Sequence, residues 1–199
     1  MIYDTLNQNP DGLRNVGAVI GAGLVLAHGW AWWKGDAARG WLRRFPFNVV
    51  LGRVLLGLAA FWAWALFKGI DWGFLSIPRM DMGEYYTLRP KIMFLIPVTA
   101  VLVAWFCEEF LSVRALGCFV LLASAIPLDA AFLHQPVSRL LLVAPTYVVV
   151  VASLFWIGMP YVLRDQIDWA TANTRRWNLL CGAGLAYWLA VLACALAWW

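Results

Sequence analysis

Charged residues are scarce in this chain of 199 residues, because only 13% are charged whereas 63% are hydrophobic. A soluble domain usually carries about 25% charged and about 45–50% apolar residues. One small core does not hide such an excess of apolar side chains, so lipid must be the solvent for much of the surface. The composition therefore argues against a soluble enzyme, a nucleic-acid binder and a disordered chain.

Reactive motifs are missing as well. The sequence contains no H-E-x-x-H, G-x-S-x-G or P-loop pattern, and no G-x-G-x-x-G after a strand. None of its cysteines forms a C-x-x-C pair, so we expect small buried hydrophobes and no metal site. They are Cys107, Cys118, Cys181 and Cys194. The first residues lack a basic leader, so no cleavable signal peptide is expected. We therefore expect no enzymatic activity.

Long apolar stretches predict an all-α integral membrane protein, a bundle of about six transmembrane helices that forms one domain over residues 1–199. The spans are expected near residues 16–33, 49–67, 92–106, 113–132, 140–163 and 179–199. The third and fourth are joined by a short acidic connection. If these two did not cross separately, the count would fall to four or five.

The connections are short, and two of them look like surface elements. Residues 68–91 mix aromatic and aliphatic side chains with charges, which is typical of a segment that lies on the membrane surface. Residues 164–177 form a second, shorter segment of this kind. No soluble domain is expected.

Lysine and arginine counts predict the orientation, since cytoplasmic loops are rich in both. Nine cations fall on one side: Lys34, Arg39, Arg43, Arg44, Arg53, Arg114, Arg164, Arg175 and Arg176. Six fall on the other: Arg14, Lys68, Arg79, Arg89, Lys91 and Arg139. The first side should face the cytoplasm of a bacterial inner membrane, with both termini outside. Tryptophans near both boundaries, Trp177 among those at the inner one, fit interfacial belts.

Two spans carry small residues at a spacing that favours close helix packing. The first span has Gly17 and Gly21 in a G-x-x-x-G pattern. The last span has a longer stripe: Gly182, Ala186, Ala190, Ala193 or Cys194, and Ala197. The pattern leaves open whether these faces meet within the chain or contact a partner subunit.

Ionisable side chains near the spans are the candidate site residues. An inner cluster combines Arg53, Glu108, Glu109 and Arg114. An arginine at that depth needs a carboxylate, so Arg53 is expected to pair with one of the two glutamates. Such a pair would either lock helices together or provide an entry site for a proton or an ion.

An outer cluster combines Asp129, His134 and Arg139. Pro127 is expected to break the fourth span just before Asp129, and a broken helix with a carboxylate can hold an ion. Simple helix termination with a solvated charge is the alternative.

A pigment or haem is the remaining cofactor hypothesis. The two histidines, His28 and His134, fall on opposite faces of the predicted bundle, which excludes a shared bis-histidine haem. His28 alone could still bind a pigment or haem, although a lone histidine in a span is more often hydrogen-bonded within the bundle. Lipids are the other expected ligands.

These features suggest two functions. The first is a non-catalytic accessory or scaffold subunit of a larger membrane complex, possibly respiratory or photosynthetic, whose partners are other membrane subunits and lipids, and no nucleic acid. The second is a small transporter or channel, alone or homo-oligomeric, that uses the intramembrane charges. A lipid-modifying enzyme ranks third.

Overall fold

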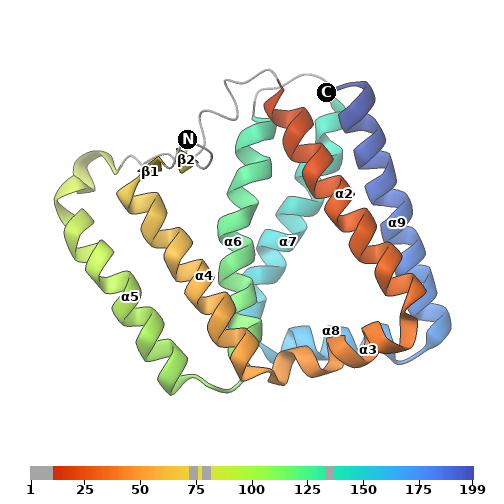
Figure 1. The fold of residues 1–199 in the computed structure, drawn as a ribbon, viewed down its shortest axis with the longest axis horizontal. Coiled ribbons are helices and arrows are strands. Elements are labelled where there is room, and N and C mark those ends of the chain that lie inside the picture. The colour runs from red at the N-terminus through yellow and green to blue at the C-terminus, as the bar shows by residue number, and fades with distance from the viewer. Residues whose placement is uncertain (1–10, 72–75, 78–81, 133–136) are drawn as a thin grey trace.

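The computed structural model describes residues 11–71, 76–77, 82–132 and 137–199. Six helices within them are long and apolar enough to cross a membrane, which confirms the predicted all-α bundle (Figure 1). They are α2 (Gly12–Trp33), α4 (Val49–Lys68), α5 (Arg89–Phe106), α6 (Leu111–Ala131), α7 (Leu140–Gly158) and α9 (Thr174–Ala197). The third and fourth predicted spans are therefore separate helices.

Shorter elements join the spans. The helical ones are α3 (Gly35–Arg44), η1 (Phe45–Phe47), η2 (Gly83–Leu88), η3 (Val137–Arg139) and α8 (Tyr161–Thr171). Two strands, β1 (Ile70–Asp71) and β2 (Ser76–Ile77), pair antiparallel with Ile70 opposite Ile77. Within the predicted surface segment 68–91, the residues of η2 are exposed, while 72–75 and 78–81 lie outside the described residues.

Prolines explain two boundaries that differ from the prediction. α5 begins at Arg89 rather than at residue 92, because Pro90 occupies the first turn, where its missing N–H leaves no bond unmade. The fifth span ends at Gly158 rather than at residue 163. Met159 precedes Pro160 and leaves the helical conformation, as residues before proline tend to do. Residues 161–163, expected to belong to this span, form the start of α8 instead.

Pro127 does not break the fourth span, contrary to the prediction, because α6 continues through it to Ala131. Pro97 and Pro145 lie inside α5 and α7 in the same way. Membrane spans tolerate such prolines since neighbouring helices and local adjustments satisfy the freed backbone groups.

The spans form two groups. α2 packs along α9, while α4, α5, α6 and α7 form the second group. At the end where α2 begins and α9 finishes, the groups meet in a buried cluster of Leu13, Ala131, Leu142 and Val191. At the opposite end they diverge, and α3 and α8 lie across the ends of the spans (Figure 1). We call this the α3/α8 end.

The small-residue face of α2 contacts α9 within the chain. A Cβ added to Gly21 would lie 3.3 Å from the Cβ of Leu192, and one added to Gly17 would lie 3.3 Å from that of Ala195. These partners are not the predicted stripe of α9, in which Ala186, Ala190, Ala193 and Ala197 are all exposed. The two stripes therefore do not pack on each other.

Glycines also allow close approach in the second group. A Cβ added to Gly52 of α4 would lie 2.6 Å from the backbone nitrogen of Ser112 in α6. One added to Gly117 would lie 3.0 Å from the carbonyl oxygen of Ser153 in α7. The neighbour of Gly52 is a backbone atom below 3.0 Å, so this crossing requires glycine. At Gly117 the nearest atom, at 2.7 Å, belongs to the side chain of Ile157, and the crossing is close but less restrictive.

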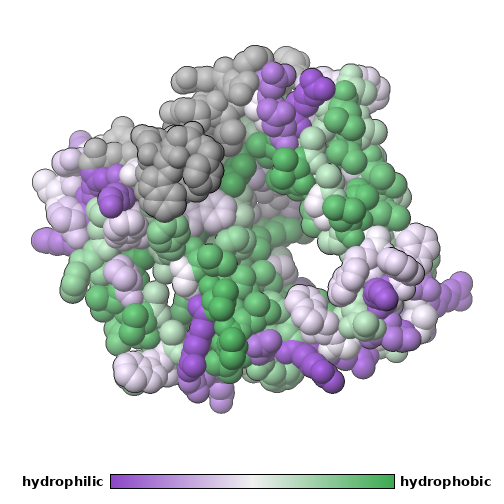
Figure 2. Space-filling view, viewed as in Figure 1, coloured by the Kyte–Doolittle hydropathy of each residue, from purple (hydrophilic) through white to green (hydrophobic). Residues whose placement is uncertain are grey.

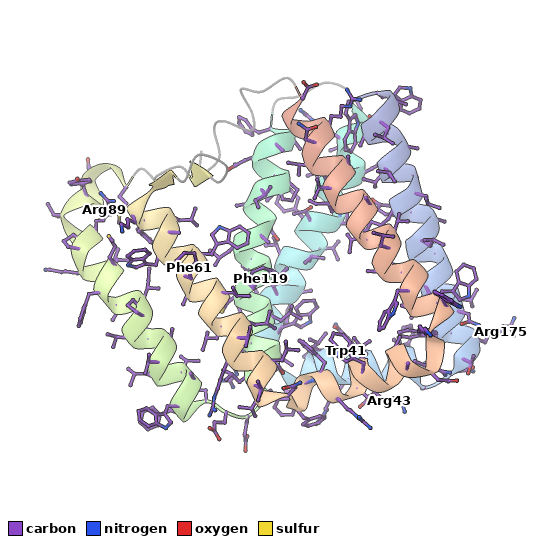
Figure 3. All side chains as sticks on the ribbon, viewed as in Figure 1. Trp41, Arg43, Phe61, Arg89, Phe119 and Arg175 are labelled. Carbon is purple, nitrogen blue, oxygen red and sulfur yellow. The ribbon has the colours of Figure 1, made fainter. Side chains whose placement is uncertain are left out.

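The surface agrees with a membrane bundle. Hydrophobic side chains cover the middle of the spans in view, and hydrophilic ones gather toward the two ends (Figure 2). Arg43 and Arg175 lie at the α3/α8 end, and Arg89 lies at the opposite end (Figure 3). There Arg89 donates hydrogen bonds to the carbonyl oxygens of Phe67 (2.7 Å) and Lys68 (2.9 Å). These bonds tie the start of α5 to the last turn of α4.

Candidate functional sites

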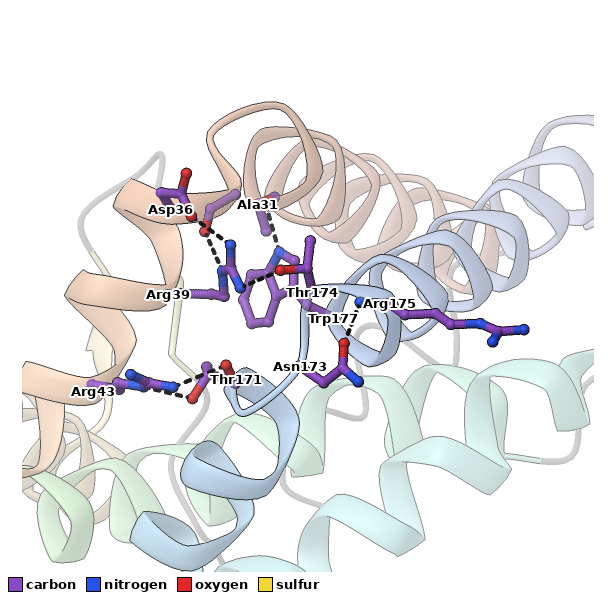
Figure 4. A network of polar contacts seen from close by, with 10 residues as sticks. Ala31, Asp36, Arg39, Arg43, Thr171, Asn173, Thr174, Arg175 and Trp177 are labelled. Carbon is purple, nitrogen blue, oxygen red and sulfur yellow. Dashed lines mark hydrogen bonds and ion pairs between the residues drawn. The ribbon is translucent and has the colours of Figure 1, made fainter.

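The α3/α8 end contains a polar network that sequence reasoning missed (Figure 4). Arg39 of α3 donates to the hydroxyl of Thr174, at the start of α9, at 3.0 Å and also forms an ion pair with Asp36. Arg43 donates to the hydroxyl of Thr171 at 2.8 Å and to its carbonyl oxygen at 2.9 Å. Two arginines counted as loop cations thus hold α3 against α8 and the start of α9.

Thr171 and Trp177 anchor this network from inside. The Thr171 side chain is buried, and its hydroxyl donates to the carbonyl oxygen of Ile167 at 2.8 Å. Trp177 is only 6% exposed and donates its indole N–H to the carbonyl oxygen of Ala31 at 3.2 Å. Trp177 therefore packs inside the protein, against the end of α2 and Ala38 of α3, rather than on its surface. Its predicted depth at the inner boundary stays a prediction.

The inner cluster is partly assembled. Arg53 pairs with Glu108 at 2.6 Å, as the depth of the arginine suggested, and their side chains are 51% and 55% exposed. Glu109 is exposed, and the ion pairs found among the described residues do not include it. A half-exposed pair at the ends of α4 and α5 holds these two ends together; its functional role remains a prediction.

Arg114 is the unusual member of this cluster. Its Nε atom is buried, and no described residue offers it a hydrogen-bond acceptor. The side chain lines a cavity of about 610 Å³ between α4, α5 and α6. A buried N–H without an acceptor is costly, so a ligand that offers an acceptor oxygen would be favoured at this position.

Ser112 is a structural residue that the sequence did not reveal. It is fully buried, and its hydroxyl donates to the carbonyl oxygens of Phe45 (2.8 Å) and Pro46 (3.0 Å). It thereby fixes η1 to the first turn of α6, beside the Gly52 crossing. The sequence does not show whether a serine at the start of a helix bonds to a distant segment, as Ser112 does, or to a carbonyl oxygen in its own helix.

His28 is used for packing. Its Nδ1 atom lies 2.8 Å from the carbonyl oxygen of Leu24, one turn earlier in α2. The Cδ2–Nε2 edge of its ring lies against Gly184 of α9, where an added Cβ would collide with the imidazole. Nε2 is the atom that would bind the metal of a pigment or haem, and its edge of the ring faces a helix backbone. The contact favours a histidine that joins α2 to α9.

The outer cluster is only partly visible. Asp129 lies in the last turns of α6, and Arg139 closes η3. Arg139 donates to the carbonyl oxygen of Ala131 at 3.3 Å, so a cation complements the C-terminal end of α6. His134 lies outside the described residues.

The cysteines are free thiols: one directly follows α5, one lies in α6 and two lie in α9. Among the described residues, no group of three or more His, Cys, Asp or Glu side chains is arranged to hold a metal ion. Comparison of the chain with protein-family models, with curated proteins and with solved structures finds no match.

Proposed function

We propose that the chain is a non-catalytic accessory or scaffold subunit of a larger membrane complex, and that it docks on a partner subunit through α9. The observation that carries this proposal is the exposed stripe of Ala186, Ala190, Ala193 and Ala197. Its spacing of four, three and four residues places all four side chains on one face of the helix. Small side chains on one face let another helix approach closely, and this chain leaves the face uncovered.

The use of the interior hydroxyl groups supports a structural role. Ser124, Thr146 and Ser153 each donate to a carbonyl oxygen one turn earlier in their own helix, at 2.7–2.8 Å. Ser112 and Thr171 are occupied by the contacts described above. The donor hydrogen of each of these five hydroxyl groups is thus used within the protein.

The α3/α8 end is proposed to face the cytoplasm of a bacterial inner membrane. All nine cations of the richer side belong to helices or helix ends there, including those of α3 and of the first turn of α9. Anionic lipid head groups and the positive-inside bias favour that placement. Both ends of the chain would then be outside, because the number of spans is even.

To test this, the chain is tagged, expressed in its native cells and purified in mild detergent. Mass spectrometry identifies the co-purifying chains, and an absorption spectrum of the same peak tests for a bound pigment. We expect at least one different membrane protein in stoichiometric amount. A monodisperse monomer, or copies of this chain alone, would contradict the proposal.

Ala190→Leu tests the docking face, since a leucine would separate two closely packed helices. The variant should lose the partner while keeping its own thermal stability, because Ala190 is exposed. Ala144→Leu, an equal change at an exposed position of α7, is the matched control and should retain the partner. Loss of the partner from both variants would show that the α9 stripe has no special role.

A transporter or channel is the less supported alternative. The ion pair that would serve it, Arg53 with Glu108, lies at the ends of the helices with both side chains half exposed rather than midway through the bundle.

A further inference from the structure

The cavity between α4, α5 and α6 is a long apolar groove. Its walls include Ala60 of α4, Ala100 of α5 and Leu122 of α6. Ile92 and Val103, both on α5, line it toward its two ends and are separated by about 16 Å of helical rise. One leaflet of a bilayer core is about 15 Å thick, so the groove matches the depth of a single leaflet.

The groove has one charged end. Arg114, Cys118 and Leu121 follow one another along the face of α6 that lines it, with Arg114 nearest the α3/α8 end. The nearby carboxylate of Glu108 is already paired with Arg53, and Nε of Arg114 is buried without an acceptor. The groove therefore presents one guanidinium, with a buried Nε that lacks an acceptor, at the level of the helix ends and apolar side chains at greater depth.

We propose that this groove binds an anionic phospholipid, with one acyl chain along α5 and the phosphate at Arg114. A phosphate offers acceptor oxygens that match a guanidinium, and it lies at the boundary depth of the lipid leaflet. A phosphate brings both acceptor oxygens and the opposite charge to the guanidinium, whereas a neutral acceptor on a partner helix would leave the charge of Arg114 uncompensated. The site is independent of the α9 docking face and does not rest on the subunit proposal.

Native mass spectrometry of the full chain with added phosphatidylglycerol, and with phosphatidylcholine of the same acyl chains, measures the binding. We expect one phosphatidylglycerol to bind more tightly than phosphatidylcholine. Arg114→Gln should weaken phosphatidylglycerol binding at least about tenfold, since a charge-assisted contact is lost. Arg44→Gln is the matched control, because it removes an exposed cation from the same end, and it should leave the affinity unchanged. Equal affinities for Arg114→Gln and the unmodified chain would overturn the proposal.

A second pair of variants tests the apolar part without touching the charge. Ala100→Phe fills the groove and should reduce binding, whereas Ala144→Phe on α7 should not. The unmodified chain provides a measurement that does not depend on any variant folding. Phosphatidylglycerol with a photoreactive group in its acyl chain should crosslink mainly to the groove-lining residues of α4, α5 and α6. Crosslinks spread evenly over all six spans would exclude a defined site.

Discussion

Replacing Gly52 with alanine tests the contact between α4 and α6. The new Cβ would lie 2.6 Å from the nitrogen of Ser112 and 3.0 Å from the carbonyl carbon of Leu111. Both are backbone atoms, so the clash can be relieved only if α4 and α6 move apart by up to about 1 Å. A gap of that size removes a quarter to a half of the dispersion energy of each atom contact between the helices. Overpacking of this kind costs about 1–3 kcal/mol. Strain on the buried Ser112 hydrogen bonds adds about 1 kcal/mol.

The expected loss of about 2–4 kcal/mol corresponds to a fall in Tm of roughly 5–15 °C for a chain of this size. A thiol-reactive fluorogenic dye reports unfolding in detergent, because the chain has four free cysteines, of which Cys181 is buried. Gly57→Ala is the matched control in the same helix. No atom lies within 4 Å of its added Cβ, so we expect a change within about 1 kcal/mol, set by helix propensity.

The comparison is decisive because both substitutions add one methyl group to α4. If Gly52→Ala and Gly57→Ala unfolded at the same temperature, the close crossing of α4 and α6 at Gly52 would be refuted. If both lost several degrees, added side-chain volume on α4 in general, and not the contact with Ser112, would be responsible.

Three further predictions concern polar contacts. Ser112→Ala should destabilise the fold by about 1–3 kcal/mol, because the buried bonds of its hydroxyl to Phe45 and Pro46 are lost; the carbonyl oxygen of Phe45 keeps the N–H of Asn48 as a donor. Ser124→Ala loses only an intrahelical bond and should cost less in the same melting assay. A double-mutant cycle with Arg53→Gln and Glu108→Gln should give a coupling free energy of unfolding below about 1 kcal/mol that decreases with salt, because both side chains are half exposed. A larger coupling free energy that does not change with salt would indicate a desolvated pair. Arg43→Met should accelerate hydrogen exchange in α3, since both bonds to Thr171 are lost, and unchanged protection would show that these bonds do not hold α3 in place.

The amphipathic α3 could have been recognised from the sequence. Ala38, Trp41 and Leu42 share one face of a helix, and Arg39 and Arg43 lie beside it. Counting the segment only as a cationic loop hid this periodicity. Pro160, similarly, could have ended the fifth span at its observed position.

The contacts of single side chains could not have been recognised. Arg53 and Arg114 are both arginines near the inner ends of spans, and the sequence placed them in one cluster with two glutamates. Only the packing of α4, α5 and α6 pairs Arg53 with Glu108 and leaves Nε of Arg114 buried beside an apolar groove. The same is true of the two small-residue stripes: that of α2 is covered by α9, whereas the four alanines of the α9 stripe are exposed.

The sequence by itself determined that the chain forms six apolar helices with more cations at one end. This follows from local composition, because lipid as solvent demands a continuous apolar stretch and an internally hydrogen-bonded helix for each crossing. Tertiary structure decided which faces of those helices meet. That choice depends on the rotation of each helix about its own axis and on close crossings such as that of Gly52 with Ser112. At such crossings, residues far apart in the sequence come within a few ångströms of each other, and this determines which polar atoms form hydrogen bonds.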